Sequence, residues 1–315
     1  MSVKFAPPLE SRLFARARGW LPSLLVAAVA LCAAFECKAQ SCDLALAQAP
    51  GAVTINYNPF GAGASAAALD VKLENRADSA CDLRLAFEDD AGAEIVGLPL
   101  GGVGVQFRPR ETSGFTVSML EPGVFHFTLA GHTTQEVQFD VAVVVEAVPE
   151  AGEHAADLQL IVRDTDRNEL LPSVPVRVVL VSTPRAQLNL AGAAGAFGSD
   201  SSVEVVDFGD AVTGATRRIF VQVRANTPSI LTIKSEHRGA MRRVTDDKIA
   251  TESSVPYAVD LAGEAVDLSA LWSKDVDPPR TLAGMSLPMS FTLGAVGSQM
   301  AGRYEDILTI DVSPN

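Results

Sequence analysis

The sequence has few of the residues on which enzymes and metal sites depend. It contains no G-x-S-x-G, H-E-x-x-H or glycine-rich phosphate loop. The acidic pairs Asp89–Asp90 and Asp246–Asp247 are expected to be solvated turns rather than general acid–base groups. Only 4 residues are histidine, and their spacing fits no metal-ligand pattern. We therefore expect that the protein is not an enzyme and that it binds no metal and no other cofactor. The histidines are His126, His132, His154 and His237.

Basic and aromatic residues are also scarce. The 25 Lys and Arg residues are outnumbered by 38 Asp and Glu, which gives a formal net charge of −13. A chain this acidic repels nucleic acid, so a nucleic-acid partner is excluded. Aromatic residues make up 6% of the sequence, and Trp272 is the only tryptophan outside the N-terminal leader. Clustered tryptophans, as expected on a carbohydrate-binding face, are therefore missing.

Only one long hydrophobic run is present, from Trp20 to Phe35, and it follows three arginines. This run is short for a membrane span and is typical of a secretory signal peptide over residues 1–39, cleaved after Ala39. An uncleaved N-terminal anchor is the alternative. Removing residues 1–39 takes away a net charge of +3 and leaves −16.

Only 4 cysteines occur, and Cys32 and Cys37 fall within the predicted leader. The remaining pair, Cys42 and Cys81, predicts a disulfide in an exported protein. The alternative is two unpaired thiols. A bridge would contribute about 3–4 kcal/mol through the chain entropy of the unfolded state.

Beyond the leader, helical periodicity is almost absent and short runs alternate apolar with polar residues. Examples are Leu69–Leu73, Val137–Val141 and Val174–Val178, each bounded by turn-forming residues. This alternation indicates an all-β fold.

The apolar pattern repeats at an offset of about 150 residues. Val53-Thr54-Ile55 aligns with Val203-Glu204-Val205, and Cys81 and Leu83 align with Leu231 and Ile233. Further aligned positions are Val71 with Val221, Phe139 with Met289, and Leu158, Leu160 and Val162 with Leu308, Ile310 and Val312. The repeat predicts two tandem Ig-like β-sandwich domains. A chance alignment of two unrelated all-β halves is the alternative.

The two copies end differently. After Val162 the first copy adds a further strand, Val174–Val181, whereas the second stops soon after Val312. The C-terminal domain is therefore predicted to lack its last strand. A sandwich without an edge strand exposes unpaired backbone groups beside core side chains, and a strand from another chain can occupy that edge.

Several stretches of the second copy resemble the spore coat protein U domain. They are Val206-Asp207-Phe208-Gly209, the strand Val221–Asn226, Tyr257–Asp260, and the most specific of them, Ala301–Ile310, which reads A-G-x-Y-x-D-x-L-T-I. The first copy departs from this pattern, with His154 at the position of Tyr304 and Ala156 at that of Asp306.

The resemblance implies the two-domain tip adhesin of an archaic chaperone–usher pilus, which mediates surface attachment and biofilm formation. Residues 40–184 would be a self-complete adhesion domain, and residues 185–315 a pilin domain that accepts a donor strand. The implied partners are a neighbouring pilin subunit, a periplasmic chaperone, an outer-membrane usher and an abiotic or host surface. The chain would pass through the periplasm to the pilus tip on the cell surface.

Two other functions remain open from the sequence. One is a periplasmic pilus-assembly chaperone, which also has a pair of Ig-like domains but which the acidic charge disfavours. The other is a carbohydrate-binding β-sandwich.

Tyr304 is expected to form a hydrogen bond with nearby backbone, like a tyrosine corner, and Asp306 is expected to end a turn.

Two sets of residues are candidates for binding. The donor-strand groove is predicted to be lined by Val203, Val205, Phe208, Leu308, Ile310 and Val312. Apolar loops of the first copy are the candidates for adhesion, although the same residues could be buried strands: Pro59, Phe60, Leu98, Pro99, Leu100, Val103, Val124 and Phe125.

Overall fold

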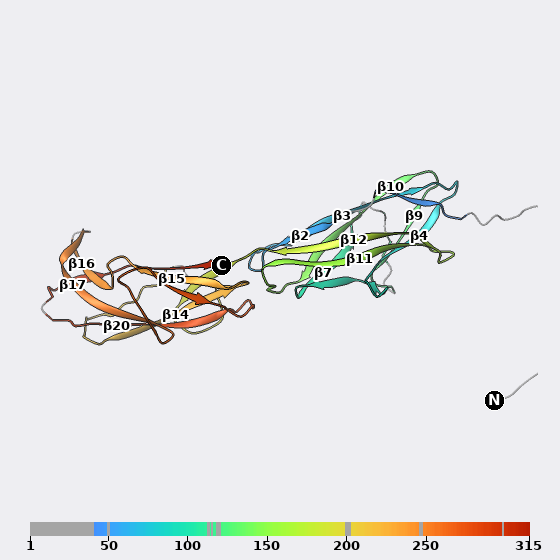
Figure 1. The fold of residues 1–315 in the computed structure, drawn as a ribbon. Coiled ribbons are helices and arrows are strands. Elements are labelled where there is room, and N and C mark those ends of the chain that lie inside the picture. The colour runs from blue at the N-terminus through green and yellow to red at the C-terminus, as the bar shows by residue number, and fades with distance from the viewer. Residues whose placement is uncertain are drawn as a thin grey trace, which may run out of the picture. The chain divides into compact units, whose positions relative to one another are not determined.

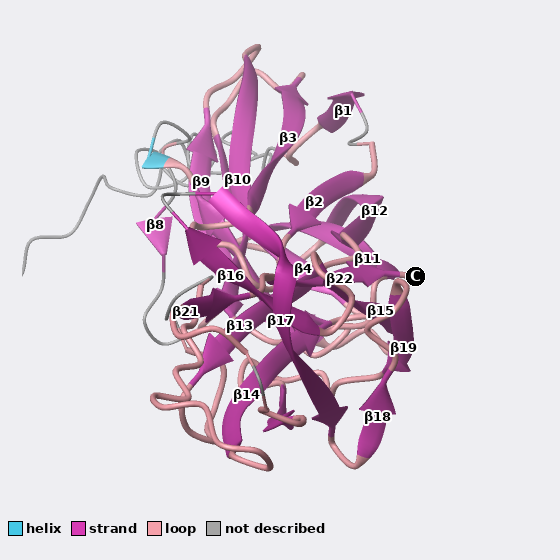
Figure 2. Ribbon diagram, turned by 90° about the vertical axis from the view of Figure 1, so that its left-hand side faces the viewer, coloured by secondary structure: helices cyan, strands magenta, loops and turns pink. Residues whose placement is uncertain are grey.

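The computed structural model describes residues 41–48, 51–111, 114, 116–117, 121–198, 203–245, 248–297 and 299–315. The predicted signal peptide lies outside these residues. The fold is all-β, with strands, drawn magenta in Figure 2, joined by loops, and no described residue lies in an α-helix. Accordingly, none of the described segments is a helix long and apolar enough to cross a membrane.

Strands β1 to β12 form the first β-sandwich (Figure 1). One sheet has the order β1-β3-β10-β7-β6, and the other has the order β2-β12-β11-β4-β9-β8, with β5 paired to β4. The strands are β1 (Leu44–Gln48), β2 (Val53–Tyr57), β3 (Ala66–Asn75), β4 (Cys81–Glu88), β5 (Glu94–Ile95), β6 (Gly97–Leu100), β7 (Val103–Pro109), β8 (Thr116–Val117), β9 (Val124–Leu129), β10 (Thr134–Val145), β11 (Gly152–Asp164) and β12 (Leu170–Ser182).

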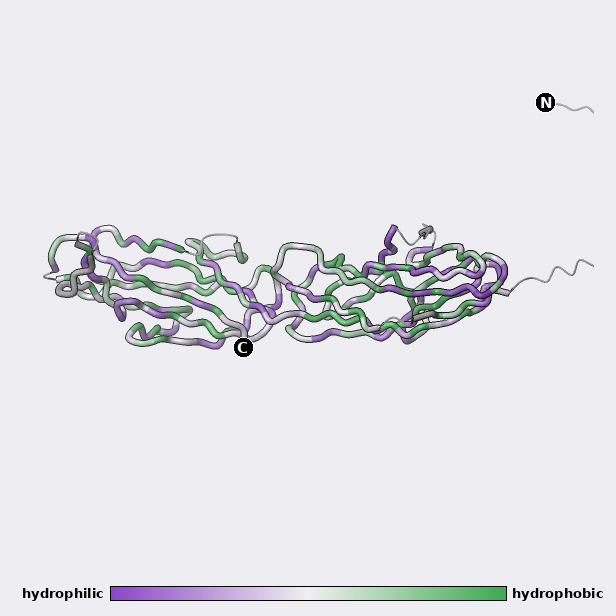
Figure 3. The backbone as a smooth tube through the Cα atoms, turned by 90° about the horizontal axis from the view of Figure 1, so that it is seen from above, coloured by the Kyte–Doolittle hydropathy of each residue, from purple (hydrophilic) through white to green (hydrophobic). Residues whose placement is uncertain are grey.

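The core of the first sandwich follows from the period of two along its strands (Figure 3). On β3 the alternate residues Leu69, Val71 and Leu73 are buried, and those between them are exposed or half-buried. Facing side chains are joined through aromatic contacts, since the ring of Phe87 stacks on Phe107 at a centroid distance of 3.9 Å.

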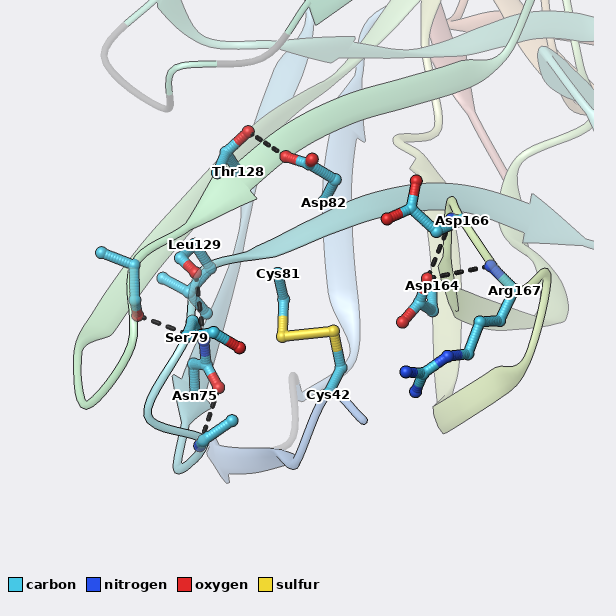
Figure 4. The surroundings of a disulfide bond; sticks show 12 residues. Cys42, Asn75, Ser79, Cys81, Asp82, Thr128, Leu129, Asp164, Asp166 and Arg167 are labelled. Atoms are coloured by element: carbon cyan, nitrogen blue, oxygen red, sulfur yellow. Dashed lines mark hydrogen bonds between the residues drawn. A yellow bond between two sulfur atoms is a disulfide. The ribbon is translucent and has the colours of Figure 1, made fainter. Parts of the chain in front are cut away.

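The disulfide predicted from the sequence is present between Cys42 and Cys81, with the two Cα atoms 5.8 Å apart (Figure 4). It ties the segment before β1 to the first residue of β4. Beside it, the buried amide of Asn75 donates to the carbonyls of Ser79 and Leu129, which fixes the turn between β3 and β4.

Strand β12 closes the first sandwich. It pairs antiparallel with β11 and parallel with β2, so β11 has a neighbour on both edges. The alternate residues Val174, Val176, Val178 and Leu180 are at most 2% exposed. Burial of four such side chains contributes roughly 6–12 kcal/mol to folding before entropy is counted.

Strands β13 to β22 form the second β-sandwich. One sheet has the order β13-β14-β20-β17-β16-β21, with β18 paired to β17, and the other has only β19-β15-β22. The strands are β13 (Ala186–Ala191), β14 (Thr216–Ala225), β15 (Ser229–Ser235), β16 (Ala240–Thr245), β17 (Lys248–Leu261), β18 (Glu264–Val266), β19 (Trp272–Val276), β20 (Met285–Leu293), β21 (Arg303–Glu305) and β22 (Leu308–Pro314).

Strand pairing bears out the offset of 150 residues in one sheet of each sandwich. Phe139 of β10 opposes Leu69 of β3, and Met289 of β20 opposes Ile219 of β14. Each residue of the second pair lies 150 positions after its counterpart, so the two antiparallel strand pairs correspond residue by residue.

The offset does not hold throughout the other sheet. Leu85 of β4 opposes Val162 of β11, whereas Leu231 of β15 opposes Val312 of β22. If Val312 corresponds to Val162, Leu231 corresponds to Leu85 and not to Cys81, so the predicted alignment of Cys81 with Leu231 is wrong in that frame. The connection before β15, residues 226–228, is two residues shorter than the one before β4, residues 76–80, which accounts for part of the four-residue difference in offset.

Candidate functional site

Strand β22 has a free edge. It pairs with β15 on one side, and no described strand pairs with its other side. Its counterpart β11 lies between β4 and β12. The second sandwich therefore presents a row of unpaired backbone N–H and C=O groups along β22 where the first sandwich has a closing strand.

A groove of about 320 Å³ runs beside this edge, and we call it the open groove. One wall is the segment Glu204–Phe208, and the other is formed by Arg303–Leu308 and Ile310. Core side chains from the opposite sheet form its floor. These floor residues are Leu190, Ile219, Tyr257, Phe291 and Met241.

The open groove leaves part of the second core half-covered. Leu158, Leu160 and Val162 of β11 are 4%, 0% and 0% exposed. Their counterparts Leu308, Ile310 and Val312 pack against the second core but are only half-buried. Four of the predicted groove residues, Val205, Phe208, Leu308 and Ile310, line the open groove, and Val312 continues the same face of β22 beyond it.

The predicted groove residues Val203 and Val205 do not face the core, and of the two only Val205 lines the open groove. Val203 is 69% exposed and Val205, at the border of the groove, is 82% exposed. Val206 and Phe208 pack against the core instead. Because the sequence Val203–Phe208 carries apolar residues at both odd and even positions, the period of two does not decide which face turns inward.

This wall segment has no strand partner among the described residues, although it corresponds to β2 of the first sandwich. Strand β2 is held by pairing with β12, and no described strand of the second sandwich takes the place of β12. The end of the segment is fixed differently, since the guanidinium of Arg217 donates to the carbonyls of Asp207 and Phe208 and lies over the Phe208 ring at 5.8 Å.

A buried carboxylate closes one end of the open groove. The side chain of Asp306 is 2% exposed and accepts hydrogen bonds from the Ser235 hydroxyl at 2.6 Å and the Tyr257 hydroxyl at 2.6 Å. It also accepts from the backbone N–H of His237 and Ile307, and the His237 Nδ1 atom lies 2.9 Å away. Burial, followed by the hydrogen bond to Asp306, raises the pKa of Tyr257 above its ordinary value.

This cluster marks the point where the chain changes sheets. Before Asp306, β21 pairs with β16, and after it β22 pairs with β15. The turn predicted at Asp306 is thus a sheet crossing held by a carboxylate with several donors. The predicted backbone bond of Tyr304 is present, since its hydroxyl donates to the Met300 carbonyl at 2.7 Å.

Most of the predicted adhesion residues are not on exposed loops. Leu98, Leu100, Val103, Val124 and Phe125 lie in strands β6, β7 and β9 and are at most 8% exposed. Their glycine-rich flanks suggested loops, but the alternation of β6 and β7 buries these side chains in the first core. Of the others, Pro59 is buried, Phe60 is half-buried and Pro99 is exposed.

The sequence did not single out the floor of the open groove. Leu190, Ile219 and Phe291 lie on β13, β14 and β20, and Met241 and Tyr257 lie on β16 and β17. Their alternation identifies them as core residues, but nothing in the sequence says which core residues lie beneath the missing strand. No three His, Cys, Asp or Glu side chains in the described ranges are arranged to hold a metal ion.

Comparisons with known proteins give no family and no curated relative. No protein-family model matches the chain, so the resemblance to the spore coat protein U domain stays a prediction. A search of curated proteins also finds no match.

Solved structures with similar topology are found at low identity. The chaperone–tip adhesion subunit pre-assembly complex CsuC–CsuE from archaic chaperone-usher Csu pili of Acinetobacter baumannii matches at 11% identity and TM-score 0.47, covering 86% of this chain and 99% of that chain. The CupB6 tip adhesin from Pseudomonas aeruginosa matches at 10% identity and TM-score 0.36, covering 86% and 93%. CfaE, the adhesive subunit of CFA/I fimbria of enterotoxigenic Escherichia coli, matches at 12% identity and TM-score 0.35, covering 85% and 93%. At these scores the function has to be argued from the geometry of this chain.

Proposed function

We propose that the chain is a tip adhesin subunit of an archaic chaperone–usher pilus, and that the open groove accepts a strand donated by the next subunit. The observation that carries the proposal is the contrast between β11, which is paired on both edges, and β22, which is paired on one. The inward residues of β11, which β12 covers, are buried, whereas the corresponding residues of β22 are half-buried.

The energetics favour an incoming strand over a lasting open edge. A strand with four inward apolar side chains, like those of β12, would contribute roughly 6–12 kcal/mol before the cost of ordering it. This is comparable to the net stability of a whole domain. Backbone hydrogen bonds to β22 would hold the strand, and the side chains of the open groove would select it.

The N-terminal region supports a terminal place in the fibre. Cys42 is held by the disulfide, and β1, which begins at Leu44, is already paired with β3. Cys42 and strand β1 are therefore already held within the first sandwich and are not free to serve as a donor strand for another subunit. The chain would accept a strand without giving one.

In this proposal, residues 1–39 are the signal peptide, residues 40–184 the adhesion domain and residues 185–315 the strand-accepting domain. A periplasmic chaperone would occupy the open groove until the usher exchanges it for the neighbouring pilin. The first domain would then attach the pilus to an abiotic or host surface and support biofilm formation. Of the apolar residues first considered, Pro99 remains exposed, whereas the half-buried ring of Phe60 lies under the guanidinium of Arg224 at 4.8 Å.

Covalent self-complementation tests the central step. A flexible linker and a strand with the sequence of Leu171–Val181 are added after Asn315 of the mature chain, residues 40–315. Protection of β15 and β22 from hydrogen exchange should rise at least tenfold, while β4 and β11 stay unchanged. The matched control replaces the four inward residues of the added strand with serine. Equal protection in the fusion and the control would refute the proposal.

The same experiment separates the two rival functions. A periplasmic chaperone is complete by itself, so its second sandwich would show full protection without any added strand. A carbohydrate-binding protein would gain protection from a glycan rather than from a strand. Secretion gives a further distinction, because an adhesin reaches the cell surface only when the usher is present.

A further inference from the structure

The rim of the open groove carries exposed apolar side chains that the proposed function does not use. Ile307, directly before β22, is 62% exposed, and Val203 and Val205 on the opposite wall are 69% and 82% exposed. These three residues alternate with the inward residues Leu308 and Val206. They therefore flank the gap on its solvent side, one on one wall and two on the other.

The solvent side of β22 also carries an acidic side chain. Asp311 lies four positions after Ile307 on the same face, is exposed, and forms no ion pair with any described residue. The outward row of β22 thus runs from an apolar residue at Ile307, through Thr309, to an acidic residue at Asp311.

The first sandwich shows how such an outer row is matched by its closing strand. On β11 the outward Asp157 opposes Arg177 of β12, and the guanidinium Nη1 atom lies 3.0 Å and 3.1 Å from the two carboxylate oxygens. The inward residues of β12 fill the core, while one of its outward residues, Arg177, complements the charge of its neighbour. Cross-strand pairs of this kind contribute roughly 0.2–1 kcal/mol each.

Resting on the proposed function, we infer that the second sandwich selects the donated strand through side chains on both faces of that strand, the inward face and the outward face. The partner is an extended segment of another chain that runs antiparallel to β22, as β12 runs to β11. Opposite Asp311 it carries Lys or Arg on its outer face. Four positions later the donated strand carries an outward apolar residue. This residue lies opposite Ile307, between Ile307 and the wall that carries Val203 and Val205.

The inference fixes a sequence pattern for the donor. The pattern spans seven residues, of which the first, third, fifth and seventh face inward and are apolar. The three outward residues between them, in the N-to-C direction, are basic, neutral and apolar. A strand read on its inner face alone would alternate apolar with any polar residue. The outward apolar residue breaks that alternation, so the pattern distinguishes the donor from ordinary amphipathic strands.

Synthetic peptides and the full mature chain test both contacts. The parent peptide follows the pattern with lysine and isoleucine at the two outer positions, and its fluorescein anisotropy with residues 40–315 gives the dissociation constant. Replacing the lysine with glutamate should weaken binding about two- to fivefold, and this order should reverse in the Asp311→Lys chain. Replacing the isoleucine with threonine should weaken binding about two- to fivefold in the native chain but not in Ile307→Thr.

The outcomes separate the inference from the proposed function. If all peptides with inward apolar residues bind equally well, whatever their outer residues, the groove reads one face and the inference is overturned while the proposed function stands. A peptide preference that persists unchanged in Asp311→Lys or in Ile307→Thr also overturns it. If no peptide binds, including the parent and one with threonine at every outer position, the proposed function itself fails and the inference fails with it.

Discussion

The hydroxyl of Tyr257 donates a 2.6 Å hydrogen bond to the carboxylate of Asp306, joining β17 of one sheet to the point where the chain enters β22 of the other. Tyr257 also lines the floor of the open groove, and Asp306 lines its wall. The pair therefore connects the stability of the second sandwich to the shape of the groove.

Replacing Asp306 with alanine should destabilise the second sandwich by roughly 2–5 kcal/mol. The substitution leaves the hydroxyls of Ser235 and Tyr257 and two backbone N–H groups without their acceptor in a buried site. Urea unfolding, followed by hydrogen exchange in β15 and β22, measures the loss. The matched control is Asp311→Ala on the exposed face of β22, where the change should stay within about 0.5 kcal/mol. Equal effects of the two substitutions would contradict this account.

Alkaline pH should weaken the second sandwich through Tyr257. Burial raises the pKa of this phenol in the folded chain above its ordinary value of about 10, so the contribution is complete below pH 10. Above pH 10 the unfolded chain loses a proton that the folded chain keeps, and stability falls as the pH rises. Ultraviolet absorbance of ionised tyrosine should show one group fewer titrating above pH 10 in native protein than in unfolded protein, once Tyr57 is replaced with Phe. In a Tyr257→Phe chain that difference should vanish.

Loss of the disulfide should affect the first sandwich. Cys42 and Cys81 are 39 positions apart, and opening this loop should cost about 3–4 kcal/mol by the chain-entropy model. Hydrogen exchange in β1 and β4 should accelerate in a Cys42→Ser, Cys81→Ser chain, and exchange in β15 and β22 should not. Acceleration in β22 alone would show that the bridge does not act where the structure places it.

Leu160 and Ile310 form a matched pair for the missing strand. Leu160 is fully buried, so Leu160→Ala should lower the free energy of unfolding by about 2–5 kcal/mol both in the native chain and in the self-complemented fusion. Ile310 is half-buried beside the open groove, so Ile310→Ala should cost roughly 1 kcal/mol in the native chain but 2–4 kcal/mol in the self-complemented fusion. Calorimetric unfolding of the four chains gives the comparison, and an Ile310 effect that does not grow in the fusion would contradict the proposed insertion.

Much of the fold could be predicted from the sequence because strands with one buried face carry a strict period of two. The correspondence of Phe139 with Met289 follows from that period together with the repeat, whereas their pairing with Leu69 and Ile219 is known only from the structure. The pairing of β22 on one edge only, among the described strands, agrees with the prediction that no closing strand follows Val312.

The details of the groove could not be predicted to the same extent. The segment Val203–Phe208 is apolar on both faces, so its inward side depends on tertiary contacts such as those of Arg217. Likewise, glycine next to Leu98 and Val103 is compatible with a loop or with a close strand pair, and only the pairing of β6 with β7 decides between them.

The two closing edges also differ in proline. Strand β12 carries Pro172 and Pro175 in the stretch that β2 does not reach, whereas β22 has no proline before Pro314. A proline has no N–H to offer, so it discourages any further strand from adding there. Two molecules with unguarded β22 edges can therefore also join each other, and soluble material kept without its partners should disappear at a rate that grows with the square of its concentration.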